Sequence, residues 1–169
     1  MTGFEDANLK IVVMNWGIPE IDELKNRNLK FVFDKEDLPK LKNFNYHVSE
    51  GSTRFCLYDI DTNETIFIMD FFEPSDLIKA LDPEKYQKSI KLELMYVPVA
   101  NLRCKGIASY YYKKMQELML DKGFNKINLI VNPKADVFKK QDMTNSLSKE
   151  ELMTYYENHL LDGITANFS

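Results

Sequence analysis

The fold of this chain is most constrained by residues 92–123. Their pattern is that of a strand, a short basic loop and an amphipathic helix. Leu92, Leu94 and Tyr96 alternate with other residues, as a strand requires. Pro98 then ends the strand, because proline has no backbone N–H to donate. The helix that begins near Gly106 presents apolar residues at three- and four-residue spacing, namely Ile107, Tyr111, Met115 and Leu118.

The loop between this strand and this helix favours an anion. Gly106 lets the backbone come close to a ligand. The N–H groups of residues 104–108 and the positive end of the helix dipole would attract negative charge. Arg103 and Lys105 add positive charge. The alternative is an ordinary strand-to-helix turn in which Gly106 serves only the turn.

Length and composition bound the class of protein. The chain has 169 residues, of which 44% are hydrophobic and 28% charged, values typical of one globular domain. No apolar run approaches the roughly 20 residues of a membrane helix. The N-terminus lacks the basic region and apolar core of a signal peptide. We therefore expect a cytoplasmic protein without a membrane partner.

The cysteines and the net charge exclude further classes. Cys56 and Cys104 make no disulfide framework, and they lack metal-ligand spacing with His47 and His159, so no metal is expected. A net charge of −4 argues against a nucleic-acid partner and is compatible with an amine substrate. Whether the chain forms a homodimer is left open.

The remaining elements are read from periodicity and turn residues. Strands are expected at residues 9–14, 29–33, 54–60, 65–72 and 126–131, the third and fourth as an antiparallel hairpin. Short helices are expected near Pro19 and at residues 133–140, and residues 74–89 should form helical turns or a surface loop. Ser148 and Glu151 form a capping box that opens a last helix, which Gly163 can close.

Arg103, Gly106 and Ala108 have the spacing of a known signature. This spacing resembles the acyl-CoA pyrophosphate motif of the GCN5-related N-acetyltransferases (GNAT), which lies between a strand and a helix. That motif reads Arg or Gln, any two residues, Gly, any one residue, and then Gly or Ala. A second strand followed by Asn132 has the family's order. The resemblance covers residues 54–160. It implies one acetyltransferase domain over residues 1–169, of α/β (α+β) class, with a mixed, mostly antiparallel central sheet flanked by helices.

The resemblance also implies how acetyl-CoA would bind as co-substrate. In the family, the strand before the loop splays at a bulge, and its backbone pairs with the pantetheine arm. Here the bulge would fall at Met95, Tyr96 and Val97. The pyrophosphate would lie against the loop and helix start, formed by Arg103, Cys104, Lys105, Gly106, Ile107 and Ala108. Asn132 could bond the pantetheine or be only a turn residue.

The family often takes its final proton from a tyrosine after Asn132. Asn132 and Ala135 match that pattern, but Lys139 stands at the tyrosine place. The later Tyr155-Tyr156-Glu157 resembles the end of the same family helix. Tyr156 shares a helix face with apolar residues and should point inward as the proton donor, whereas Tyr155 should be rotated away. The alternative is that Tyr156 only packs.

Glu93 is the carboxylate on the central strand. Similar enzymes often use a glutamate there to take the amine's proton. If it lies among apolar residues with Met95 and Val97, burial would raise its pKa toward a useful range. The alternative is a solvent-facing strand position.

The resemblance therefore implies transfer of the acetyl group of acetyl-CoA to a primary amine of a small molecule or peptide, directly within a ternary complex. The alternative is a catalytically inactive acyl-CoA-binding or protein-interaction module of the same fold, which Lys139 favours. Residues 15–41 and 74–89, which would line the acceptor pocket, carry no recognisable motif.

Overall fold

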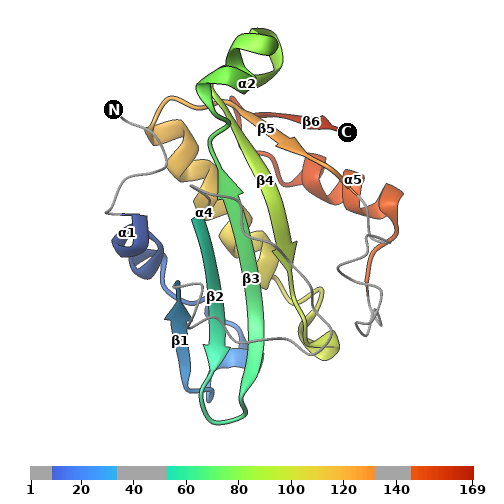
Figure 1. Ribbon diagram of the computed structural model, residues 1–169. Helices are drawn as coiled ribbons and strands as arrows, with labels where there is room; N and C mark the ends of the chain where they lie inside the picture. The colour runs from blue at the N-terminus through green and yellow to red at the C-terminus, as the bar shows by residue number, and fades with distance from the viewer. Residues whose placement is uncertain (1–8, 34–52, 132–145) are drawn as a thin grey trace.

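Six strands form one open sheet whose order follows the chain (Figure 1). The computed structural model describes residues 9–33, 53–131 and 146–169. Neighbours from β1 to β4 pair antiparallel, and β4–β5 and β5–β6 pair parallel. The strands are β1 (Leu29–Val32), β2 (Thr53–Asp59), β3 (Glu64–Phe72), β4 (Ser89–Tyr96), β5 (Lys126–Leu129) and β6 (Thr165–Phe168). The expected mixed, mostly antiparallel sheet with helices is confirmed.

Helices α1 and α4 cover one face of this sheet (Figure 1). The rings of Trp16 and Tyr111 stack on Phe71 and Phe67, which lie on that face. The described helical segments are α1 (Leu9–Trp16), η1 (Asp22–Leu24), α2 (Asp76–Leu81), α3 (Pro83–Tyr86), η2 (Ala100–Leu102), α4 (Ile107–Asp121) and α5 (Lys149–Asn158). Aromatic rings that interlock across the face make the core continuous from α1 to β3.

The strand expected at residues 9–14 is wrong, because this segment forms α1. Leu9 and Val13 are buried, and Ile11 and Met14 are more than half exposed. An apolar run fits either period, so the neighbouring surface decides. Only one face of this segment packs against the rest of the protein, and the spacing of its buried residues is that of a helix.

Helix α4 begins and ends as expected. Its N-cap Gly106 has a φ of +96°, a left-handed value that glycine adopts without strain. The predicted face, Ile107, Tyr111, Met115 and Leu118, is buried. After the helix, Gly123 has a φ of +84°, and the N–H of Phe124 donates to the carbonyl of Met119 at 2.8 Å, which closes the last turn.

The bulge expected at Met95, Tyr96 and Val97 lies instead at Glu93. Asp70 pairs with Leu94 and the next residue, Phe71, pairs with Leu92, so Glu93 has no partner on β3. Leu92 therefore lies on the α4 face, and Leu94 lies on the opposite face. Met95 and Tyr96 pair with β3 in regular register, so the simple alternation expected from Leu92 onward breaks at Glu93.

Strand β5 is shorter than expected, and this shapes the site. Its parallel pairing with β4 runs from Ser89–Lys126 to Leu92–Leu129 and then stops. Strand β4 continues to Tyr96, and within the described residues no strand pairs with it on that side past Leu92. The two strands therefore leave an opening at their carboxyl ends.

Several expectations fall on residues that are not described. Asn132, Ala135, Lys139 and the short helix expected at residues 133–140 lie outside the described ranges. None of the helices within those ranges combines the length and the apolar character that a membrane crossing demands.

Candidate ligand site between β4, β5 and the start of α4

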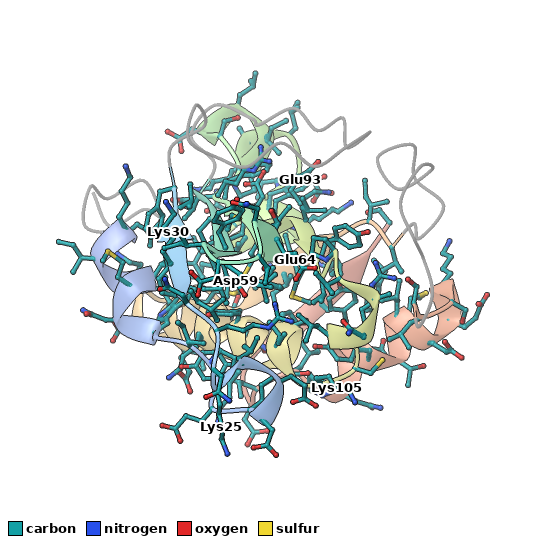
Figure 2. All side chains as sticks on the ribbon, turned by 90° about the horizontal axis from the view of Figure 1, so that it is seen from below. Lys25, Lys30, Asp59, Glu64, Glu93 and Lys105 are labelled. Carbon is teal, nitrogen blue, oxygen red and sulfur yellow. The ribbon has the colours of Figure 1, made fainter. Side chains whose placement is uncertain are left out.

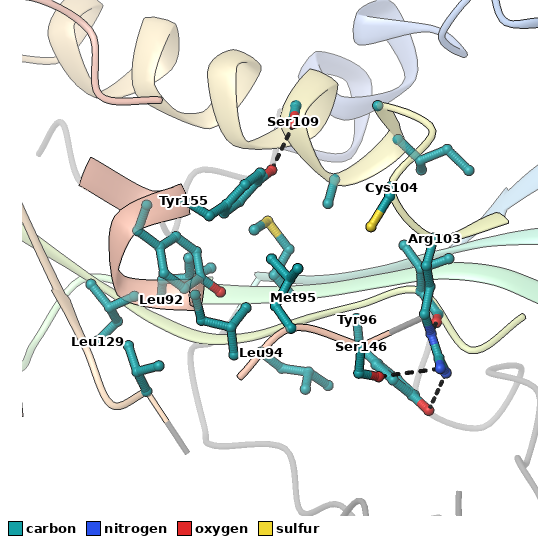
Figure 3. Close-up of a pocket in the computed structure, with 18 of the residues that line it drawn as sticks. Leu92, Leu94, Met95, Tyr96, Arg103, Cys104, Ser109, Leu129, Ser146 and Tyr155 are labelled. Carbon is teal, nitrogen blue, oxygen red and sulfur yellow. Dashed lines mark hydrogen bonds between the residues drawn. The ribbon is translucent and has the colours of Figure 1, made fainter. Parts of the chain in front are cut away.

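A cavity of about 570 Å³ occupies the opening between β4 and β5 and reaches the start of α4 and one side of α5 (Figure 3). It is lined by residues 92–97, 102–104, 106–109, 129–131, 146–147, 152 and 155–156. One end is apolar, between Leu92 and Leu129, and the other lies against the loop at Cys104 (Figure 3). The shape and lining suit a ligand with an apolar arm and a polar, anionic end.

The end of the cavity at α4 has the features of an anion site. The first N–H groups of a helix have no partner within the helix, and the N-cap of α4, Gly106, has no side chain to accept from them. A Cβ built on Gly106 would meet no heavy atom within 4 Å, so the backbone is open to a close approach. Cys104 also has a left-handed φ, of +61°, and this turns the loop into the helix.

The structure brings most of the expected cofactor-binding residues together. Met95, Tyr96, Val97, Arg103, Cys104, Gly106, Ile107 and Ala108 all line the cavity. Lys105 is not among its lining residues. The Nζ atom of Lys105 lies 3.8 Å from a carboxylate oxygen of Glu23, and the side chain is nearly half exposed. Figure 2 shows Lys105 and Glu93 far apart.

Arg103 is directed inward rather than over the loop. Its Nε donates to the carbonyl of Val97 at 2.8 Å, and its Nη2 donates to the carbonyl of Pro98 and to the hydroxyl of Tyr96, each at 3.1 Å. Its Nη1 donates to Oγ of Ser146 at 3.3 Å. The side chain is 8% exposed. Arg103 thus links β4, the loop and the segment before α5.

Helix α5 starts at the capping box expected from the sequence. The Ser148 hydroxyl accepts the N–H of Glu151, and the Glu151 carboxylate accepts the N–H of Ser148. This cap fixes the helix that carries Tyr155 and Tyr156 along the cavity.

Both tyrosines line the cavity, so the expectation that Tyr155 points away is wrong. Its hydroxyl lies 2.8 Å from Oγ of Ser109 in the first turn of α4. Helix α5 lies beside α4, so the adjacent residues Tyr155 and Tyr156 both contact side chains of α4. Tyr156 packs edge-on against Tyr112 at 5.4 Å between ring centroids and is 9% exposed.

The hydroxyl of Tyr156 differs from that of Tyr155. Within the described ranges no hydrogen-bond partner contacts it. Burial raises the pKa of Tyr156 above its ordinary value near 10. Burial also raises the pKa of Tyr155, against a smaller opposite effect of the Ser109 hydrogen bond. Both phenols therefore hold their protons at neutral pH.

Glu93 lines the cavity at the bulge, but its side chain is exposed. The apolar enclosure expected around it is absent from the described residues. Its carboxylate reaches solvent as well as the cavity, so an acceptor amine could approach it from outside.

Ser109, Ser146 and Tyr155 are the polar lining residues that sequence reasoning missed. Ser109 was detectable as the hydroxyl in the first turn of a helix otherwise rich in tyrosine. Ser146 carried no signal, because its partner Arg103 is far away in the chain.

No cluster of three metal-ligating side chains occurs in residues 9–33, 53–131 and 146–169.

Comparison of the chain with family models, curated proteins and solved structures finds no match.

Proposed function

We propose that this chain is an N-acetyltransferase of the GCN5-related type, which moves the acetyl group of acetyl-CoA to a primary amine of a small molecule or peptide. The observation that carries the proposal is the opening beside β4. The β4–β5 ladder stops at Leu92–Leu129, and the cavity that fills the gap ends at the uncapped start of α4.

The residues present fit acetyl-CoA. Buried backbone polar groups need partners, and the edge of β4 past Leu92 has no partner strand in the described residues. An extended pantetheine arm can supply such partners, as an added strand would. The N–H groups at residues 104–108 suit the pyrophosphate, because a helix start attracts anions. Lys105 adds a diffuse positive charge only.

The chain's own groups would then perform the proton transfers. Acetyl-CoA supplies an activated acyl carbon and a thiolate leaving group. Glu93 would take the proton that the attacking amine nitrogen loses as its bond to the acyl carbon forms. Tyr156 would give the proton of its hydroxyl to the sulfur as the carbon–sulfur bond breaks. Positioning of both reactants in the one cavity supplies much of the rate.

A second candidate is an inactive module of this fold that binds acyl-CoA or a protein. The exposed Glu93 carboxylate and Lys139 at the family's tyrosine place favour it. Incubation of the protein with acetyl-CoA and a panel of polyamines, aminoglycosides, amino acids and peptides separates the two. Thiol release above a blank without acceptor supports the enzyme, and acetyl-CoA binding without turnover on any acceptor supports the module.

A thermal-shift titration with CoA tests the site itself. Ligand at about 100 times its dissociation constant stabilises the folded state by roughly 2.7 kcal/mol. That should raise the melting temperature by several degrees, at about 2–4 °C per kcal/mol for a domain of this size. A flat response at millimolar CoA would overturn the proposal.

Two glycine variants give a matched comparison. Gly106→Glu places a side chain and a negative charge where the phosphates would lie, so it should abolish the shift. Gly123→Glu is the control, because Gly123 also has a left-handed φ and open space at its Cβ but lies at the far end of α4. The shift should survive in the control, and equal loss in both variants would contradict the site.

A further inference from the structure

We infer that Arg103 is a positioning residue that holds the mouth of the cavity together, and that its guanidinium does not bind the anionic end of the ligand. This inference rests on the proposed function only for the identity of the ligand. Arg103 is buried, whereas Lys105 of the same loop is nearly half exposed. The guanidinium of Arg103 donates to groups of Tyr96, Val97, Pro98 and Ser146.

The contacts of Arg103 join three segments, which are the end of β4, the loop after it and the segment before α5. The carbonyls of Val97 and Pro98 come just after β4 ends, where the sheet no longer supplies donors. The guanidinium pairs with both, which offsets the cost of burying them. The Tyr96 hydroxyl, at the last position of the strand, is held by the same Nη2.

The fourth contact joins Arg103 to the segment before α5. Ser146 lies two residues before Ser148, the N-cap of α5, and its Oγ accepts from Nη1 of Arg103. Figure 3 shows the guanidinium between Ser146 and Tyr96 at the loop end of the cavity. The side chain therefore sets the distance between the end of β4 and the entry to α5, which carries Tyr155 and Tyr156.

These contacts also argue against a direct phosphate contact. Most of the guanidinium N–H donors already have acceptors within the protein. Turning Arg103 toward a phosphate would break its hydrogen bonds to the buried carbonyl of Val97 and the part-buried carbonyl of Pro98, which is costly.

Backbone amide exchange in the ligand-free protein tests the positioning role without reference to any ligand. Arg103→Met should speed exchange in residues 99–103 and at the start of α5 by about tenfold or more, the usual worth of a hydrogen bond to a charged group. Exchange in β2 and β3 should not change. Lys113→Met, which removes an exposed cation from α4, is the control and should change neither segment. Unchanged exchange at both segments in Arg103→Met would overturn the inference.

Milder variants cover the case in which Arg103→Met does not fold. Ser146→Ala removes the hydroxyl that accepts from Nη1 of Arg103, so exchange should rise at the start of α5 and not at residues 99–103. Tyr96→Phe removes the hydroxyl at the end of β4 that accepts from Nη2 of Arg103, and it should leave α5 unchanged. The reverse pattern, or a uniform rise over all segments in both variants, would overturn the inference.

Two ligands separate positioning from phosphate binding. Pantetheine lacks phosphates, and CoA carries them. A positioning role predicts that Arg103→Met weakens the binding of both by a similar factor, measured by NMR titration, whereas loss for CoA alone would show a direct phosphate contact and overturn the inference. Should the parent protein bind neither compound, the proposed function fails, and the exchange experiment still decides the role of Arg103.

Discussion

The hydroxyl of Tyr155 lies 2.8 Å from Oγ of Ser109, and this hydrogen bond ties α5 to the first turn of α4. It joins the helix that carries the candidate proton donor to the helix whose start forms the candidate anion site. The two ends of the cavity are thus held in one geometry by a contact between segments distant in the chain (Figure 3).

We expect the Tyr155–Ser109 hydrogen bond to stabilise the fold by about 1 kcal/mol. Tyr155→Phe and Ser109→Ala should each lower the unfolding free energy by about that amount. The double variant should be little worse than either single one, because both remove the same contact. Urea unfolding of the four proteins measures this cycle, and fully additive losses would show that the two side chains are not coupled.

The role of Tyr156 is tested by Tyr156→Phe. As the proton donor to the leaving thiolate, its loss should lower kcat by roughly 10²–10⁴-fold, the usual worth of a positioned acid, while acetyl-CoA affinity barely changes. The ring stays in place, so packing against Tyr112 is kept. Steady-state kinetics with a productive acceptor gives the answer, and parent-like turnover would remove Tyr156 from the catalytic residues.

The two cysteines should differ sharply in reactivity. Cys104 is exposed and lines the cavity, whereas Cys56 is buried. Burial raises the pKa of the Cys56 thiol to about 12, although the nearby Thr65 hydroxyl and the charge of Arg54 act in the opposite sense. Because the thiolate is the reactive form, iodoacetamide at pH 8 should alkylate Cys104 and leave Cys56 intact.

Acetyl-CoA should slow the alkylation of Cys104, because its pyrophosphate would lie against the loop. Peptide mass spectrometry after timed quenching measures both sites in one sample. Alkylation of Cys56 in urea is the control that this thiol is chemically competent. If saturating acetyl-CoA gave no protection of Cys104, the ligand would not occupy this loop.

Asp59 should make the stability of the fold depend on acid pH. Burial alone would raise the pKa of Asp59, but hydrogen bonds from the N–H of Thr62 and from the Arg27 guanidinium lower it. The N–H of Asp61 adds to this effect. Figure 2 shows Asp59 beside Glu64, the second carboxylate that Arg27 contacts.

Because the folded-state pKa lies below the unfolded value near 3.9, the charged form adds stability above that value, and this stability is lost as pH falls through the folded pKa. Asp59→Asn should therefore cost about 1–3 kcal/mol at pH 7 and much less at pH 2–3. Urea unfolding at the two pH values measures the difference. Asp61→Asn, an exposed carboxylate of the same turn, is the control, and an Asp59→Asn deficit that persists in acid would contradict the account.

Local signals in the sequence were sufficient for a large part of the fold. The hairpin of β2 and β3, the apolar face of α4 with Gly106 and Gly123 at its ends, and the capping box at Ser148 were all predicted correctly. Each depends on interactions within a few residues of the chain. Glycine adopts a left-handed φ without strain, and a serine hydroxyl accepts from the N–H group three residues later. The left-handed turn at Gly106, which leads the loop into α4, follows from the same local features.

Only the tertiary structure decided the orientation of several side chains and the secondary structure of one segment. Residues 9–14 form a helix because only one stripe of this segment packs against the sheet. The bulge falls at Glu93 because Leu92 and Leu94 pair with adjacent residues of β3. Arg103 turned inward because two carbonyls and Ser146 arrive beside it from other segments. Tyr155 faces the cavity because α5 lies against α4. Burial and hydrogen bonding depend on which distant surface arrives, and periodicity within one segment carries no information about its partner.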